Sequence, residues 1–192
     1  MHGYSERGSS EQVLILVETT TSRLSLKRIP VSVLVLLGLM SLSGSFAAEP
    51  DSGAQVAPDF ALRSLAGDNI RLSEYRGNVV LLGFWARWCG DCRQAMQALN
   101  EVNKKYQRAG LVTLGINVGD TEEQTATMAR SLGLEFPVLV DTTKVASSQF
   151  NLKSMPLMLL IDREGRIRET YAGFERGQEL LITEKLRQLL NE

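Results

Sequence analysis

Two cysteines separated by two residues, Cys89 and Cys92, constrain this chain more than any other feature, because they are its only cysteines. The apolar run of residues 79–85 leads into them and predicts a buried β-strand, since it is continuous and begins with β-branched residues. After Cys92, apolar residues recur at helical spacing, at positions 95, 99, 102 and 106. Cys89 is therefore expected where a strand passes into a helix, with Cys92 in the first turn of that helix.

The start of a helix favours thiol chemistry. Its unpaired N–H groups and its dipole stabilise a thiolate relative to a thiol. A spacing of three residues across the first turn also brings the two sulfur atoms within bonding distance. We expect Cys89 to be the attacking thiolate and Cys92 the resolving thiol, which attacks the mixed disulfide and releases the product.

Two other uses of a Cys-x-x-Cys pair are weaker. A zinc site needs two further ligands, usually Cys or His, and the only histidine, His2, lies far away in the N-terminal tail. A purely structural disulfide would close a very short loop and would restrict the unfolded chain little. Redox chemistry is therefore favoured, and for it we expect neither a metal nor a cofactor. Because no histidine occurs beyond residue 2, a Ser/His or Cys/His catalytic pair is also excluded.

Residues 1–47 read as a tail that ends in a secretory signal peptide. Lys27 and Arg28 precede an apolar run at residues 31–40, and the small residues Ser45 and Ala47 occupy positions −3 and −1 of a cleavage site. We expect the start of translation to be assigned too early and the true signal to begin near residue 24, because a basic region normally opens such a signal. An uncleaved membrane anchor and a cytoplasmic protein with an apolar tail are the alternatives, although the run is shorter than the ~20 residues of a membrane span. Export, for example to the periplasm, would place the cysteines where disulfides persist.

Residues 48–56 are expected to be a linker, and residues 57–192 a single domain. Strands and helices alternate along this domain, which predicts an α/β fold with a central sheet. A net charge of −1 without a basic stripe excludes nucleic acid as a partner. Strands are expected at residues 58–62, 69–72, 79–85, 111–118, 136–140, 157–161 and 166–171, and helices after Cys92, from Thr121, at residues 144–150 and at residues 177–190.

Five segments resemble exported thioredoxin-like proteins of the TlpA/ResA type: residues 57–62, 72–77, 84–93, 136–138 and 155–165. The resemblance implies a thioredoxin fold, which is a central mixed β-sheet flanked by helices, with an N-terminal β-hairpin and an inserted helix. It implies disulfide exchange with exported proteins, apocytochrome c thiols among them, a membrane electron donor and an active monomer. Residues 151–156 lack the Gly-x-Pro-Glu signature of the dedicated cytochrome-maturation branch, which makes that role weaker.

The resemblance also implies roles for three residues near the cysteines. Pro156 is expected to be cis and to face the pair, and Met155 to offer its backbone to an extended substrate segment. The residues alone also fit a proline at the start of a strand. Trp88 is expected to form an aromatic lid beside Cys89, with simple packing as the alternative.

The chain departs from the family pattern at three positions that bear on proton transfer. Asp91 replaces the usual proline, Ala95 replaces a glutamate, and Gly83 replaces the buried carboxylate of thioredoxins proper. Asp91 and Arg87 should shift the pKa of the Cys89 thiol in opposite directions, since a carboxylate disfavours the thiolate and a guanidinium favours it. We hypothesise that Asp91 keeps the reduction potential low.

The leading hypothesis is a thiol–disulfide oxidoreductase that acts outside the cytoplasm as a reductant. A peroxiredoxin-type peroxidase would need a Pro-x-x-x-Thr-x-x-Cys arrangement, and residues 83–88 before Cys89 do not supply it. A non-enzymatic peptide-binding module is the other alternative, although the intact cysteine pair argues against it.

Overall fold

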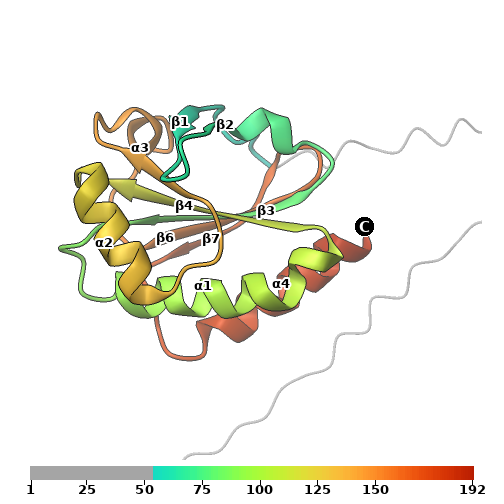
Figure 1. The fold of residues 1–192 in the computed structure, drawn as a ribbon. Coiled ribbons are helices and arrows are strands. Elements are labelled where there is room, and N and C mark those ends of the chain that lie inside the picture. The colour runs from blue at the N-terminus through green and yellow to red at the C-terminus, as the bar shows by residue number, and fades with distance from the viewer. Residues whose placement is uncertain (1–53) are drawn as a thin grey trace, which may run out of the picture. The chain divides into compact units, whose positions relative to one another are not determined.

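The computed structural model describes residues 54–192. Its centre is a five-stranded sheet in the order β5-β4-β3-β6-β7 (Figure 1). The parallel half consists of β3 (Val79–Trp85), β4 (Leu111–Val118) and β5 (Val138–Asp141). In the other half, β6 (Leu157–Ile161) is antiparallel to β3, and β7 (Ile167–Ala172) is antiparallel to β6. The sheet is therefore mixed, as predicted.

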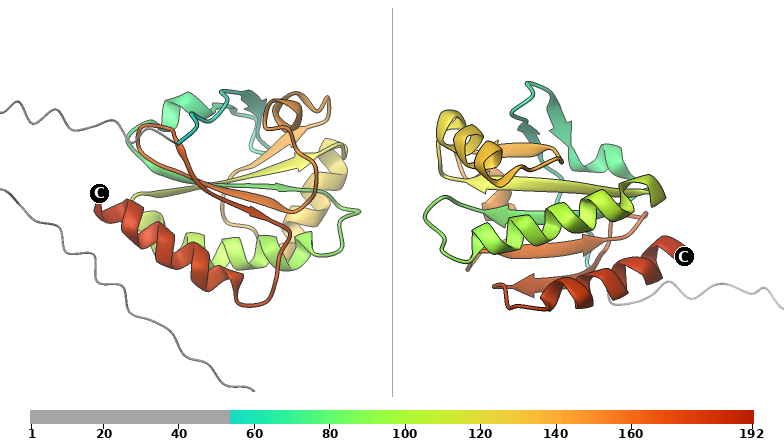
Figure 2. Two further views of the ribbon diagram at one scale, coloured as in Figure 1. Left: turned by 180° about the vertical axis from the view of Figure 1, so that it is seen from behind. Right: turned by 60° about the horizontal axis from the view of Figure 1, so that its bottom comes forward.

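Helices cover both faces of the sheet (Figures 1 and 2). One face carries the three longer helices, α1 (Cys92–Tyr106), α2 (Glu122–Leu132) and α4 (Gln178–Asn191). The other face carries the short helix α3 (Val145–Gln149), the 3-10 turn Leu72–Tyr75 and the hairpin of β1 (Ala61–Arg63) and β2 (Asn69–Arg71). This is the thioredoxin fold with an N-terminal hairpin, and two helices, α2 and α3, lie between β4 and β6.

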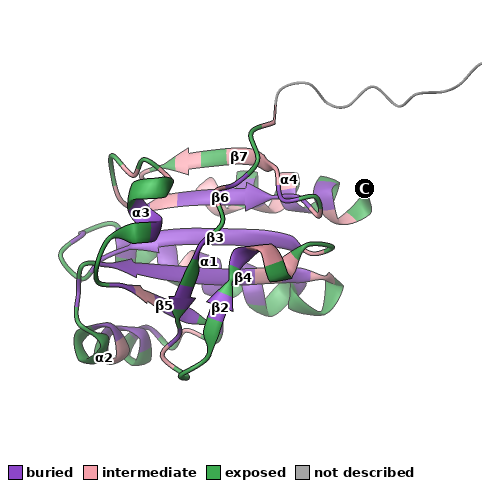
Figure 3. Cartoon of the chain, turned by 90° about the horizontal axis from the view of Figure 1, so that it is seen from above, coloured by how far each residue is buried: buried purple, intermediate pink, exposed green. Residues whose placement is uncertain are grey.

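The central strand β3 is buried along its whole length, as Figure 3 shows. Its side chains alternate between the two faces of the sheet, and both faces are covered, so every position can be apolar. This explains why the strand appears in the sequence as a continuous run rather than as an alternation. Facing α1, α2 and α4 are Val79, Leu81 and Trp85; facing the hairpin and α3 are Val80, Leu82 and Phe84.

Local signals in the sequence are confirmed at several element ends. Thr121 and Gln124 form the expected capping box at the start of α2, with backbone-to-side-chain distances of 3.0 and 3.3 Å. Gly110 has a φ of 98° and separates the α1 segment from β4. The N–H of Gly165 donates to the carbonyl of Asp162 at 2.9 Å and closes the turn between β6 and β7. The hairpin strand expected at residues 58–62 is shorter and begins only at Ala61.

The N-terminal part of the described chain is held against the β6–β7 end of the sheet. The N–H of Ile167 donates to the carbonyl of Gln55 at 2.8 Å, and the N–H of Ala57 donates to the carbonyl of Gly165 at 2.9 Å. The expected signal peptide at residues 1–47, His2 and most of the 48–56 linker lie outside the described residues. Within residues 54–192, no helix is both long enough and apolar enough to cross a membrane.

Candidate active site

The two cysteines lie on the connection between the end of β3 and the start of α1. They form a disulfide in this structure, with their Cα atoms 5.4 Å apart. Cys92 is the first residue of α1 and is fully buried, whereas Cys89 keeps 9% of its surface exposed. The N–H of Cys89 donates to the carbonyl of Ala86 at 3.2 Å, which closes a turn just before the pair. Of the two cysteines, only Cys89 therefore keeps any exposed surface.

Asp91 occupies the N-cap position of α1 without capping it. Its carbonyl accepts the N–H of Ala95 at 3.1 Å, but its exposed side chain makes no capping hydrogen bond. The free N–H groups of the first turn are thus not neutralised by this carboxylate. They remain available to stabilise a thiolate at Cys89.

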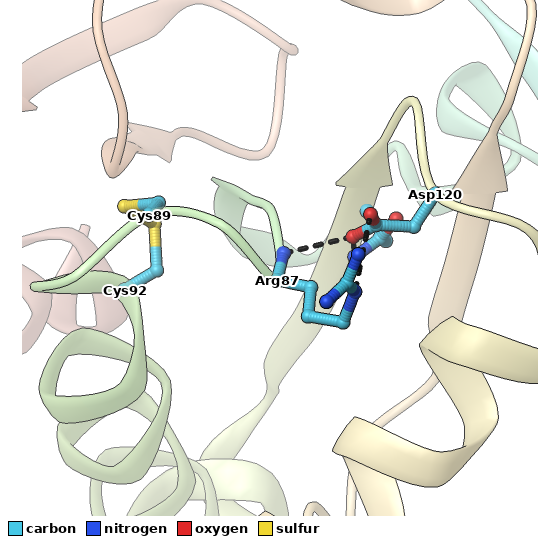
Figure 4. The surroundings of a disulfide bond; sticks show 5 residues. Arg87, Cys89, Cys92 and Asp120 are labelled. Atoms are coloured by element: carbon cyan, nitrogen blue, oxygen red, sulfur yellow. Dashed lines mark hydrogen bonds and ion pairs between the residues drawn. A yellow bond between two sulfur atoms is a disulfide. The ribbon is translucent and has the colours of Figure 1, made fainter.

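Arg87 is fixed by a residue that the sequence does not single out, Asp120. The backbone N–H of Arg87 donates to Oδ2 of Asp120 at 2.8 Å, and Nδ2 of Asn117 donates to the same oxygen at 3.0 Å. Nε of Arg87 lies 3.9 Å from Oδ1. Asp120 is only 5% exposed. Figure 4 shows the Arg87 guanidinium beside Asp120 and directed away from the cysteines.

A second cation near the pair is also directed elsewhere. Nη2 of Arg93, the residue after Cys92, lies 3.7 Å from Sδ of Met128 on α2. Neither of the two arginines nearest in sequence therefore has its guanidinium partnered with the sulfur atoms. The N–H groups at the start of α1 are the feature near the pair that favours a thiolate at Cys89.

Apolar side chains of α1 fill the space where other family members carry carboxylates. A Cβ atom on Gly83 would lie 2.7 Å from Cδ2 of Leu99 and 3.0 Å from Cε of Met96. Ala95 is fully buried in the same cluster as Cys92. The surroundings of Cys92 are therefore apolar, and the two positions that could supply a buried base do not.

The segment before β6 approaches the same loop. The Met155–Pro156 peptide bond is cis, as the resemblance implies. Phe84 pairs with Leu157 in antiparallel strands, so Pro156, the residue before Leu157, lies beside the end of β3. This end of β3 leads into the cysteine loop. Trp88 is 69% exposed, so its ring is not part of the core. Trp88, the residue before Cys89, and Met155 both line a groove of about 710 Å³.

The fold and the bridged pair define a thioredoxin-fold protein with a disulfide at the start of its first long helix. The chain belongs to the AhpC/TSA family, whose model matches residues 54–170. It is 36% identical over 117 residues to the thiol-disulfide oxidoreductase ResA of Geobacillus kaustophilus (strain HTA426), covering 61% of this chain and 67% of ResA. It is 34% identical over 128 residues to the thioredoxin-like protein YneN of Bacillus subtilis (strain 168), covering 66% and 75% of the two chains.

Solved structures agree with this assignment. A Chlorobium tepidum chain assigned as the thiol:disulfide interchange protein DsbE superposes with a TM-score of 0.68 at 31% identity, covering 71% of this chain and 96% of its own. The thioredoxin domain of a thiol-disulfide oxidoreductase from Bacteroides vulgatus gives a TM-score of 0.63 at 22% identity, covering 72% and 97%, and at that identity it supports the fold alone. The relatives confirm the resemblance to thioredoxin-like proteins of the ResA type.

Proposed function

We propose that this chain is a thiol–disulfide oxidoreductase that reduces disulfides in exported proteins through Cys89 and Cys92. The observation that carries the proposal is the unequal exposure of the bridged pair. Cys89 keeps 9% of its surface exposed, whereas Cys92, which is bonded to it, keeps none. An attacking thiol must meet a protein substrate, and a resolving thiol needs to reach only the first sulfur. The names of the relatives ResA and DsbE support the same activity.

The exchange proceeds in two balanced steps from the reduced protein. The Cys89 thiolate attacks one sulfur of the substrate disulfide; a bond forms between these two sulfurs, and the other substrate sulfur leaves as a thiolate, which takes up a proton. Cys92 then loses its proton to water and attacks the Cys89 sulfur, which releases the second substrate thiolate. Two electrons pass to the substrate, and the Cys89–Cys92 disulfide remains. A dithiol donor at the membrane, which the resemblance implies, returns the two electrons.

The neighbouring residues receive supporting roles in this proposal. Trp88 lies beside Cys89 as an exposed aromatic surface for the substrate, and Met155 offers backbone groups to an extended segment next to Pro156. Asp91 disfavours the Cys89 thiolate by its charge. Arg87 is held by Asp120, so its effect on the Cys89 pKa is weakened by the paired carboxylate.

The location and the partners are also part of the proposal. Export to the periplasm or another extracytoplasmic space rests on the signal-like residues 1–47. Apocytochrome c is one candidate substrate, weakened by the missing signature in residues 151–156. The peroxidase alternative is not favoured, because its motif does not precede Cys89 and the named relatives are thiol–disulfide oxidoreductases.

Trapping of the mixed disulfide tests the roles of the two cysteines. A Cys92→Ser variant should accumulate a covalent adduct with a disulfide-bearing protein such as insulin, seen on a non-reducing gel and lost with dithiothreitol. A Cys89→Ser variant, the matched control, should form no such adduct, because Cys92 is buried. Adducts formed through Cys92 instead would overturn the assignment. Peroxide turnover by the protein alone would favour the peroxidase alternative. Full cellular activity of the double Cys→Ser variant would favour the peptide-binding module.

A further inference from the structure

The groove lined by Trp88, the residue before Cys89, carries a charge that the cysteine chemistry does not require. It runs from Trp88 past Gly119 and α3 to the segment of residues 151–155 before β6. Two lysines line it, Lys144 immediately before α3 and Lys153 three residues before Pro156. Both are exposed. The groove therefore places two cations on the side of the active site where Met155 offers its backbone.

No carboxylate compensates for these cations in the groove. Its lining contains no Asp or Glu, and within residues 54–192 neither lysine forms an ion pair. The acidic residue nearest to α3, Asp141, is fully buried and accepts the N–H groups of Ala146 and Ser147 at 3.3 and 2.8 Å. Asp120 is likewise occupied by Arg87 and Asn117.

The position of Lys144 is constrained by its surroundings. A Cβ added to Gly119 would lie 3.4 Å from Cε of Lys144, so the end of the lysine stem packs against this glycine. Packing of the stem leaves the ammonium group free toward solvent, as is common for lysines on apolar surface. The Lys144 stem is therefore fixed by Gly119, which lines the same groove.

We propose that the groove binds the part of the substrate next to its reactive cysteine and selects segments that carry Asp or Glu there. The inference rests on the proposed function and adds the substrate class to it. An extended segment advances about 3.3 Å per residue, so a groove lined by both Trp88 and the lysines meets substrate residues that flank the cysteine. Exposed charges speed the encounter of enzyme and substrate and align the bound segment more than they raise the final affinity. The selection therefore appears in the rate of disulfide reduction.

Matched peptide substrates test this inference. Three peptides share one intramolecular disulfide and differ only in two residues beside the first cysteine, which are Glu-Glu, Gln-Gln or Lys-Lys. The value of kcat/KM is measured for each with a chemical dithiol as electron donor. At low ionic strength we expect the Glu peptide to react about threefold to tenfold faster than the Gln peptide, and the difference to shrink as salt is added.

Variants locate the effect. The double variant Lys144→Gln/Lys153→Gln should bring the Glu and Gln peptides to equal rates. Lys105→Gln makes a like charge change near the far end of α1, about 20 Å from Cys92, and should keep the preference. A preference that survives in the double variant, or disappears in Lys105→Gln, overturns the inference.

The peptide series also separates this inference from the proposed function. Equal rates for all three peptides with the wild-type protein overturn the groove's selectivity but leave the oxidoreductase activity standing. No turnover of any peptide overturns the proposed function itself.

Discussion

Asp120 anchors the cysteine loop through one of its two oxygen atoms, which makes the contribution of its hydrogen bonds separable from that of its charge. The Arg87 N–H and Asn117 Nδ2 both donate to Oδ2, at 2.8 and 3.0 Å. The guanidinium lies 3.9 Å from Oδ1, and the Arg87 side chain is 56% exposed, so this ion pair contributes little. Replacement of Asp120 by alanine removes both short bonds and leaves the Asn117 amide buried without its acceptor.

We expect Asp120→Ala to lower the free energy of unfolding by about 3 kcal/mol, because hydrogen bonds to a charged group are worth about 1.5–3 kcal/mol each and these two share one oxygen. Asp120→Asn is the control. Its amide oxygen can occupy the place of Oδ2 and accept both donors, while its nitrogen replaces Oδ1 opposite the exposed guanidinium. We expect this variant to lose less than about 1 kcal/mol.

Urea unfolding of the oxidised proteins at neutral pH measures both variants. Peptide kcat/KM supplies a second readout, since the loop that carries Cys89 loses its anchor in Asp120→Ala and keeps it in Asp120→Asn. If the asparagine variant loses as much stability and rate as the alanine variant, the charge of Asp120 matters and the hydrogen bonds do not. If the alanine variant loses less than about 1 kcal/mol, the anchor itself is refuted.

Three further substitutions probe the site and its support. Asp91→Asn should raise the reduction potential by at most about 30 mV, which corresponds to one pKa unit in a two-electron couple, and an unchanged or lower value contradicts a role for this charge. Burial raises the pKa of Asp59, but hydrogen bonds from Ser73 and Arg71 lower it by more than burial raises it. The net pKa therefore lies below its usual value. Asp59 therefore stabilises the fold above about pH 3.9 and loses this contribution as the pH falls through its lowered pKa, so Asp59→Asn should show a weaker loss of unfolding free energy between about pH 6 and pH 3. Gly83→Ala should cost about 1–3 kcal/mol in urea unfolding through contact with Leu99, and a neutral result would show that α1 yields easily.

Features set by nearby residues were predictable from the sequence. The apolar run of β3, the helical spacing after Cys92 and the capping box at Thr121 depend on contacts within a few residues or on burial of a whole strand, and the structure confirms them. The cis bond at Pro156 followed from the resemblance, because a proline at the start of a strand fits either isomer.

Features set by contacts between distant segments were not predictable. Asp120 meets Arg87 only because β3 and β4 run in parallel, with Trp85 opposite Asn117. A carboxylate just after the strand neighbouring β3 was the one signal that could have pointed to it. The side-chain direction of Arg87 and the lysine groove likewise depend on how loops from separate strands meet, which periodicity does not encode.

The reduction potential of the Cys89–Cys92 couple, measured by equilibration with a dithiol or glutathione buffer, decides whether this chain is a reductant. We predict a value at or below about −250 mV, in the range of thioredoxin, because the guanidiniums of Arg87 and Arg93 have other partners and Asp91 disfavours the thiolate. A value above about −150 mV, toward the strong oxidants, would contradict this account and make the protein a disulfide donor. The absence of any reversible couple would remove the enzymatic function altogether.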